Sequence, residues 1–380
     1  MKRFNIVICP TRNVVKRENE ALQERLDVGV SGSIKLSDVA RAAGVSLGTA
    51  SNAFNRPDLV RAEVRELVET TARALGYAGP DPIGRLLMGG KANAIGWLPA
   101  GDMSVGHAVK SPYLRALLVG VAEICDENAA SLVIVSGSYD RKEWAIRNAL
   151  VDGFILGHIE EVDMVLARQR KVPFVVMDMD ARPDVSSVRV DGRTGARLAA
   201  EHLLDLGHRR FAIVSVQRVP ANPIWHPAGE PDRRLVAGFP LDEEKLLGYR
   251  EALAAAGIAL DDVPIVESHP PTPWAEAGAR MLLDLAPEAT GILAMSDKQA
   301  ITVLDEARRR GIGVPRDLSV IGFDDASDAV VAVPPLTTIA QPTIEKGRVA
   351  ARILFEGGPV RHEVLPVELI IRASTAPPRY

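Results

Sequence analysis

From residue 94 onward, short apolar runs alternate with longer amphipathic segments, and this alternation restricts the possible folds more than any other feature. The runs lie at residues 95–98, 132–135, 153–156 and 174–177, and again at 211–214, 265–267, 291–294 and 319–321. Segments with helical spacing, such as residues 114–128, separate them. Strands that alternate with helices form parallel sheets covered by helices. Because the runs come in two series, we predict a two-lobed α/β domain over residues 94–380.

Ligands of such sheets bind beyond the carboxyl ends of the strands, so we expect the two lobes to face each other across a cleft at those ends. Residues 217–243 interrupt the second series with a long stretch that contains five prolines. Loops of this length in compact domains are either functional or disordered. Trp225 or His226 within the stretch could cover the cleft.

The region before the alternation is organised differently. Residues 78–93 are rich in glycine and proline and mark a domain boundary. Ahead of them, residues 33–77 predict a small all-α domain, with helices near 36–43, 46–54 and 60–75. Residues 1–32 carry no motif, and we predict a flexible N-terminal extension there.

The first two of these helices have the pattern of a helix-turn-helix. Ala40 is small where two helices would cross, and Gly44 permits the tight turn between them. Leu47, Gly48 and Asn52 share the outward face of the second helix, which would lie in the major groove of DNA. An ordinary helical hairpin fits the same pattern, so the motif alone does not decide between the two.

Charge is distributed unevenly along the chain. Residues 1–93 contain 14 Lys and Arg against 10 Asp and Glu, and the rest contains 31 against 39. A basic head on an acidic body is typical of a DNA-binding module joined to a larger domain, although chance asymmetry produces the same numbers. Cys9 and Cys125 fit no metal-ligand spacing. No run of about 18 apolar residues predicts a membrane span, and the apolar stretch at the start is too short for a signal peptide. We therefore expect a cytoplasmic protein.

The densest motif covers residues 38–46, which read Asp-Val-Ala-Arg-Ala-Ala-Gly-Val-Ser. Thr49, Ser51, Asn55 and the run 73–77 (Arg-Ala-Leu-Gly-Tyr) continue it. Further matching runs lie at residues 151–156, 172–178, 202–208, 248–253, 322–325, 335–338 and 369–374. With these residues the chain resembles the lactose-repressor (LacI/GalR) family over roughly residues 34–377.

This resemblance implies an N-terminal helix-turn-helix domain and a two-lobed sensor domain like that of periplasmic binding proteins. It implies a sequence-specific DNA-binding transcription regulator, by family default a repressor, whose operator affinity is switched by a small-molecule effector. Family effectors are mostly sugars. The expected partners are a pseudo-palindromic double-stranded operator and a second copy of the chain, with no cofactor, no metal and no membrane.

The resemblance assigns base reading to Leu47, Gly48 and Asn52. Asn52 can pair with adenine in two hydrogen bonds, whereas Gly48 has no side chain and Leu47 offers only apolar contact. We therefore expect weak direct readout from this helix. Phosphate contacts, which set register and not sequence, are assigned to Ser46, Thr49 and Asn55. Lys35 could add another, or could simply be a solvated lysine.

In the family, residues equivalent to 78–93 form a hinge helix that folds on the operator and inserts a leucine into the minor groove. Leu87 matches that wedge. Gly84 stands where alanine is usual, and glycine disfavours a helix by up to about 1 kcal/mol. We expect the hinge to be disordered off DNA. A plain linker is the alternative.

Effector contacts are assigned by the resemblance to six positions, namely Asp178, Lys245, Trp274, Ser296, Asp324 and Gln341. Such a set suits a polyol, since carboxylates accept hydroxyl protons and an indole stacks on the apolar face of a sugar. Lys245 departs from the family's usual arginine, and an ammonium is not equivalent to a guanidinium fork. Because Asp324 and Asp325 adjoin a turn, we expect one of them to be structural.

Two other classes of protein share some of these features. An enzyme could use the carboxylates of Asp297, Asp324 and Asp325, but the sequence shows no motif that combines a nucleophile with a base, no phosphate-binding glycine loop and no metal cluster. We therefore predict no catalytic residues. A periplasmic sugar-binding protein would share the sensor fold, but it would need a secretion signal and would lack residues 34–90.

Overall fold

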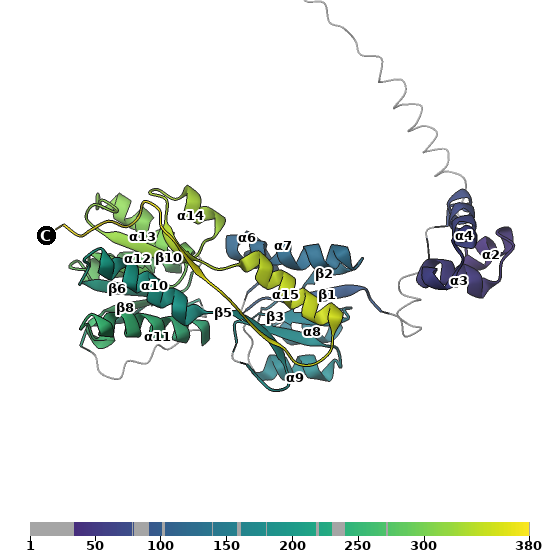
Figure 1. Cartoon of the computed structure of the whole chain (residues 1–380), viewed down its shortest axis with the longest axis horizontal. Coiled ribbons are helices and arrows are strands. Elements are labelled where there is room, and N and C mark those ends of the chain that lie inside the picture. The colour runs from purple at the N-terminus through teal and green to yellow at the C-terminus, as the bar shows by residue number, and fades with distance from the viewer. Residues whose placement is uncertain are drawn as a thin grey trace, which may run out of the picture. The chain divides into compact units, whose positions relative to one another are not determined.

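A computed structural model gives the fold (Figure 1). It describes residues 34–77, 79, 91–100, 103–138, 140–157, 161–179, 181–217, 220–229, 240–270 and 273–379. The chain divides into two compact units, residues 1–90 and 91–380, and each is described here by itself.

The first unit contains three α-helices, α2 (Leu36–Ala42), α3 (Leu47–Asn55) and α4 (Ala62–Leu75), with a 3₁₀ turn at Pro57–Leu59. All three predicted helices are confirmed. The third begins later than predicted because the 3₁₀ turn and the extended Val60 precede it. Small and branched side chains fill the core between the helices, namely Val39, Ala40, Ala50, Ala53, Val68 and Ala72. Gly44 and Gly76 end helices in the left-handed conformation, at φ +66° and +72°.

The first lobe of the second unit is built on a six-stranded, all-parallel sheet with the order β12-β5-β4-β3-β1-β2. Its strands are β1 (Ala94–Leu98), β2 (Ser131–Ile134), β3 (Gly153–Leu156), β4 (Phe174–Met177), β5 (Ser186–Val190) and β12 (His362–Leu365). Its helices are α6 (Val105–Lys110), α7 (Pro112–Glu127), α8 (Lys142–Asn148), α9 (Glu161–Gln169) and α15 (Thr343–Glu356). Side chains of one strand alternate between the faces: Ile95 and Trp97 pack on the side of α7 and α15, and Leu98 on the side of α8 and α9.

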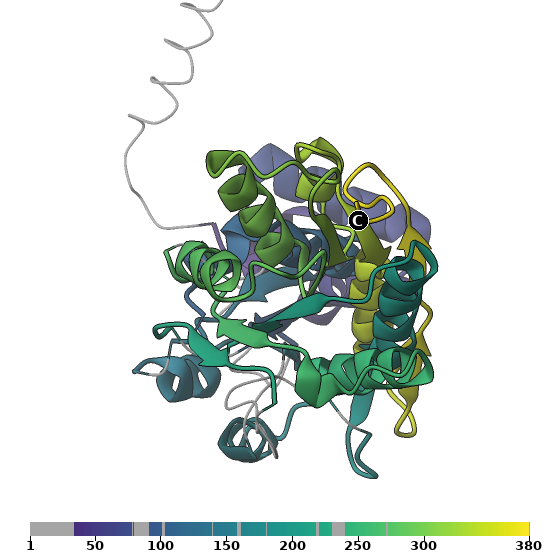
Figure 2. The same ribbon diagram turned by 90° about the vertical axis from the view of Figure 1, so that its left-hand side faces the viewer.

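The second lobe is built on a seven-stranded sheet with the order β13-β11-β10-β9-β6-β8-β7. Its strands are β6 (Phe211–Val216), β7 (Ile224–His226), β8 (Ile265–Ser268), β9 (Gly291–Ala294), β10 (Ser319–Asp324), β11 (Thr337–Ala340) and β13 (Glu368–Ile370). Its helices are α10 (Gly192–Asp205), α11 (Pro240–Ala255), α12 (Trp274–Leu285), α13 (Asp297–Arg309) and α14 (Ser327–Val331), with a 3₁₀ turn at Leu260–Asp262. Only the edge strands β13 and β7 pair antiparallel with their neighbours. Helices cover both faces of this sheet (Figure 2). The predicted two-lobed α/β architecture is therefore confirmed.

One expectation about the long stretch 217–243 is wrong. The stretch contains β7, in which Trp225 lies opposite Val266 of β8. Trp225 packs against the core of the second lobe, and the buried His226 shares a 2.6 Å hydrogen bond between its Nε2 and Glu267 Oε1. Both side chains belong to the edge of the sheet, so neither covers the cleft.

The chain crosses between the lobes at three points: from β5 to α10, from β11 to α15, and from β12 to β13. In Figure 1 the yellow C-terminal segments run between the two sheets. As a result, α15 and β12 complete the first lobe although they follow the second lobe in sequence.

Glycines allow two helices of the first lobe to touch at the backbone. A Cβ atom at Gly120 of α7 would lie 1.8 Å from the carbonyl oxygen of Ile344 at α15. A Cβ atom at Gly347 of α15 would in turn lie 2.2 Å from the carbonyl oxygen of Leu117. Only glycine fits at this crossing.

Candidate functional site

Helix α3 presents the residues predicted to read bases. Ser46 caps the helix, because its Oγ accepts a 3.0 Å hydrogen bond from the backbone N–H of Thr49. Ala50 and Ala53 bury the inner face. On the outer face Leu47 is 55% exposed and Gly48 is exposed, while Asn52 is partly buried. A large apolar side chain that is open to solvent at the start of a helix has no packing function here, which fits a contact with a partner.

The residues predicted to hold phosphates have mixed outcomes. The hydroxyls of Ser46 and Thr49 bond each other at 2.9 Å, so both already take part in the cap. Lys35 lies exposed immediately before α2, and its backbone N–H donates to the carboxylate of Asp38. The side chain of Asn55 and all of Leu87 lie outside the described residues. The phosphate contacts therefore remain predictions.

Three of the predicted effector residues lie at the carboxyl ends of strands. Asp178 follows β4 in the first lobe, whereas Asp324 ends β10 and Gln341 follows β11 in the second. Asp178 has a φ of 53° and Asp324 a φ of 133°, both in the left-handed region that costs free energy for residues other than glycine. Such strain is concentrated at functional sites in proteins.

A residue that the sequence analysis missed, Lys346 of α15, connects these three side chains. Its ammonium donates to Asp178 Oδ1 and Oδ2 at 3.0 and 2.8 Å and to Gln341 Oε1 at 3.1 Å. The other end of Gln341 donates from Nε2 to Asp324 Oδ1 at 2.6 Å. Tyr113 of α7 completes the group, because its hydroxyl donates to Asp178 Oδ2 and accepts from Lys346. The result is one polar chain from the second lobe to the first.

One signal in the sequence could have pointed to Lys346. It lies on the same buried face of α15 as Thr343, Gly347 and Ala350, at helical spacing. A lysine among buried positions needs a partner, and buried charged groups are frequently functional.

The other three predicted effector residues have separate partners. Lys245 is buried, donates to Asp242 Oδ1 at 3.2 Å and to the Met295 carbonyl at 2.8 Å, and lies 4.4 Å from the ring centroid of Phe323. Ser296 caps α13. Trp274 begins α12, and its ring packs edge-on against that of His269 at 5.4 Å. Among the described residues, neither Ser296 nor Trp274 forms a hydrogen bond with Asp178 or Asp324.

Two carboxyl groups, Asp324 of this polar chain and the neighbouring Asp297, have raised pKa values. Burial raises the pKa of Asp297 to about 6, although hydrogen bonds from Thr338 and from the Ala326 N–H oppose the shift. Burial and the charge of Asp297 raise the pKa of Asp324 to about 7, against the effect of Lys245 and Lys346. Asp325, by contrast, accepts a 2.6 Å hydrogen bond from Arg372. Asp325 is therefore the structural member of the Asp324–Asp325 pair, as expected.

These acidities predict a dependence of stability on pH. The pKa of Asp324 is about 7 in the folded protein and near 3.9 in an unfolded chain, so its stabilising effect is complete below about pH 4 and is lost as pH rises through 7. We expect Asp324→Asn, which keeps an acceptor for Gln341, to gain stability over the wild type between pH 5 and pH 8. Urea unfolding at a series of pH values measures this gain. Parallel pH profiles for the two proteins would contradict the assignment.

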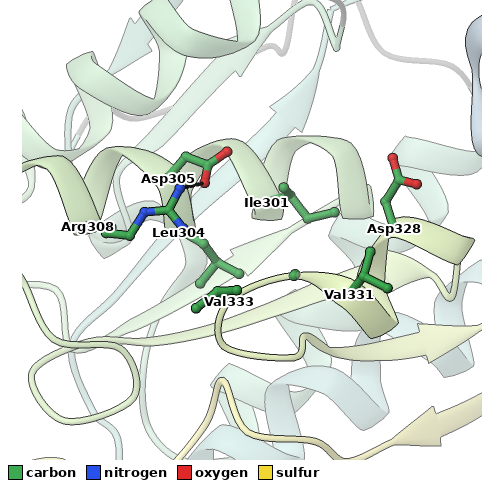
Figure 3. Close-up of a pocket in the computed structure, with 8 residues that line it drawn as sticks. Ile301, Leu304, Asp305, Arg308, Asp328, Val331 and Val333 are labelled. Atoms are coloured by element: carbon green, nitrogen blue, oxygen red, sulfur yellow. Dashed lines mark hydrogen bonds and ion pairs between the residues drawn. The ribbon is translucent and has the colours of Figure 1, made fainter. Parts of the chain in front are cut away.

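A hollow lies between α13 and α14 (Figure 3). It has a volume of about 230 Å³ and is lined by Ile301, Leu304, Asp305, Arg308, Asp328, Val331, Ala332 and Val333. None of the predicted site residues borders it.

Two further kinds of site are absent from the part of the chain that the structure describes. No group of histidine, cysteine, aspartate and glutamate side chains has the arrangement of a metal site. Likewise, no helix there combines the length and the apolar character that crossing a membrane requires.

Comparisons with known proteins agree with this geometry. Residues 35–79 match the family model for bacterial regulatory proteins of the lacI family, and residues 200–375 match that for a periplasmic binding protein-like domain. The chain is 35% identical over 356 residues to the HTH-type transcriptional regulator Rv3575c of Mycobacterium tuberculosis, covering 90% of this chain and 97% of the relative. It is 30% identical over 354 residues to the HTH-type transcriptional repressor CytR of Escherichia coli K12, covering 90% and 96%. A solved complex of the transcriptional regulator CelR with cellobiose is 28% identical, with a TM-score of 0.63 over 90% of this chain and 99% of that one.

A helix-turn-helix unit joined to a two-lobed sheet unit defines a DNA-binding transcriptional regulator with a sensor domain. The chain belongs to the LacI family of bacterial transcriptional regulators.

Proposed function

We propose that the protein represses transcription from a pseudo-palindromic operator and that a sugar bound between the lobes switches its affinity for that operator. The observation that carries this proposal is the convergence of polar side chains from both lobes at the carboxyl ends of the strands. Asp178 comes from the first lobe and Asp324 from the second, and Gln341 and Lys346 join them. A ligand at this point would contact both lobes and therefore favour one of their arrangements over the other.

Several observations support a sugar and a repressor. The CelR structure was solved with cellobiose, and the Escherichia coli relative is named a repressor. Carboxylate and amide oxygens suit hydroxyl groups, and Trp274 offers an aromatic face at the start of α12. The family consists of regulators, so we infer regulation and no catalysis, in the cytoplasm where operator DNA is found.

The proposal also assigns a function to each segment of the chain. Residues 33–77 would bind DNA, with Leu47, Gly48 and Asn52 toward the bases. Residues 78–93 would form the hinge with its Leu87 wedge, and residues 94–380 would bind the effector and the second subunit.

The experiment is a titration of fluorescently labelled DNA from upstream of the protein's own gene, followed by anisotropy, with excess random duplex as competitor and a panel of sugars. We expect specific binding that one sugar shifts. Specific binding that no sugar changes would refute the sugar effector but keep the DNA function. Failure to bind any operator, including distant ones, would refute the regulator itself.

We also propose that the hollow between α13 and α14 belongs to the contact surface of a homodimer. Val330, Val331 and Val333 are 54%, 75% and 64% exposed, an unusual concentration of apolar surface. Both charge signs border the hollow, since Arg308 lies beside Asp305 and Asp328 also lines it. A surface of mixed charge around an apolar centre can pair with itself about a two-fold axis, which is the symmetry of a pseudo-palindromic operator.

A charge placed in this surface should therefore separate the subunits. We expect Val331→Asp to weaken dimerisation by at least tenfold, because the new carboxylate would lose its water in the interface. Sedimentation equilibrium of the full-length protein gives the dissociation constant. Val165→Asp on α9, where the valine is 43% exposed, serves as the matched control. An unchanged dimer in the Val331 variant would place the interface elsewhere.

A further inference from the structure

Lys346 is fully buried and uses all of its hydrogen-bonding capacity inside the protein. Its side chain has a relative exposure of 0%. An ammonium has three protons, and three acceptor groups surround this one: the Tyr113 hydroxyl at 2.5 Å, the Asp178 carboxylate at 2.8 Å and the Gln341 amide oxygen at 3.1 Å. Burial raises the pKa of Tyr113 well above its usual value, and the charge of Asp178 adds to the shift, so the phenol keeps its proton and donates it to Asp178.

The partners of Lys346 are residues that the effector was expected to use. Asp178 and Gln341 were both predicted as effector contacts, and the ammonium already holds one oxygen of Gln341 and both oxygens of Asp178. The lysine therefore competes with the hydroxyl groups of a ligand for these oxygens, of which the Asp178 carboxylate keeps further acceptor sites.

The second buried lysine near this point is also paired with a carboxylate. Lys245, the second buried lysine, pairs with Asp242 and with the Met295 carbonyl. Asp297 and Asp324, in contrast, form no ion pair with any residue in the described part of the chain. Both lysines are thus neutralised by carboxylates, and the charge left over is negative. Among the residues that the structure describes, a phosphate or carboxylate group of a ligand would find no lysine here without a carboxylate partner, and it would be repelled in a region of low dielectric constant.

We propose that Lys346 is a specificity-determining residue of the cleft. By holding Asp178 in an internal ion pair, it leaves a cleft that admits an uncharged polyol and rejects sugars that carry phosphate or carboxylate. This inference rests on the proposed function, because it concerns the effector of the same cleft.

The first test uses matched ligands on the full-length protein. Isothermal titration calorimetry at pH 7.5 compares D-glucose with D-glucose 6-phosphate and D-glucuronate, D-ribose with D-ribose 5-phosphate, and cellobiose with cellobionate. For any parent sugar that binds, we expect the anionic derivative to bind at least tenfold more weakly. A derivative that binds more tightly than its parent overturns the proposal.

The second test does not require the effector to be known. If no sugar binds in the first test, it still supports or refutes the proposed role of Lys346. Inorganic phosphate is titrated against the wild type and Asp178→Asn at constant ionic strength, with thermal stability as the readout. We expect no saturable stabilisation of the wild type. We expect saturable stabilisation of Asp178→Asn, because the Lys346 ammonium has lost its counter-charge. The double variant Asp178→Asn/Lys346→Met should lose this stabilisation again.

A matched control is the pair formed by Lys142 and Asp163, a buried ion pair at 2.8 Å within the first lobe and apart from the Lys346 group. Asp163→Asn removes the carboxylate from that buried lysine and should gain no phosphate stabilisation. Phosphate stabilisation of the wild type, or none in Asp178→Asn, overturns the proposal. Because the phosphate stabilisation that disappears with Lys346→Met reports on the charge beside Lys346, the result is independent of whether a sugar shifts operator binding.

Discussion

Replacing Asn52 with alanine is expected to lower the affinity for the specific operator roughly ten- to a hundredfold, while binding to random DNA changes little. Of the three residues predicted to read bases, only Asn52 has a side chain that can form two hydrogen bonds with a base, since Gly48 has none and Leu47 is apolar. Loss of such a contact costs about 1–3 kcal/mol. Fluorescence anisotropy with operator and random duplexes at the same salt concentration measures both affinities.

The control for this experiment is Thr70→Ala, an exposed position on α4, which should leave both affinities unchanged. Asn52→Arg should in addition shift the preferred base from adenine toward guanine. If Asn52→Ala discriminates operator from random DNA as well as the wild type does, base reading must come from another part of the chain.

The second large effect concerns stability. We expect Gly120→Ala to destabilise the first lobe by about 3 kcal/mol, because a methyl group cannot occupy a position 1.8 Å from the Ile344 carbonyl oxygen and α7 must move away from α15. Gly106→Ala on α6, where the nearest atom lies 4.0 Å from the added Cβ, should instead stabilise by up to about 1 kcal/mol. Urea unfolding followed by circular dichroism compares the two. Equal stabilities would show that α7 and α15 can separate at little cost.

Much of the architecture could be predicted because the central strands are buried on both faces and are therefore apolar throughout. The burial of β1, β3 and β9 along their whole length illustrates this. Edge strands lack that signature. Three of the four residues of β12 are exposed, and β7 has only three residues within a proline-rich stretch. Their pairing depends on neighbours that are distant in sequence, so local patterns did not reveal them.

Sequence patterns likewise revealed only part of the candidate site. The resemblance to the lactose-repressor family pointed to Asp178, Asp324 and Gln341, and the structure places them in one polar chain. Tyr113 and Lys346 were missed because 233 positions separate them and each lies in a helix with an ordinary amphipathic pattern. Only the packing of α7 against α15 brings their polar atoms together. The ion pair between Lys346 and Asp178 could therefore not be inferred from composition or spacing.

The three crossings between the lobes also determine the order in which the molecule can be completed during its synthesis. A ribosome delivers β1 to β5 first, but α15 and β12 emerge only after nearly all of the second lobe. Until then, Leu117 and Val121 of α7, which are buried in the finished protein, have no covering helix. The second lobe in turn lacks its edge strand β13 until the first lobe has received β12. Neither lobe can therefore finish folding until almost the whole chain has been synthesised, and the nascent chain carries an uncovered apolar surface for most of its elongation.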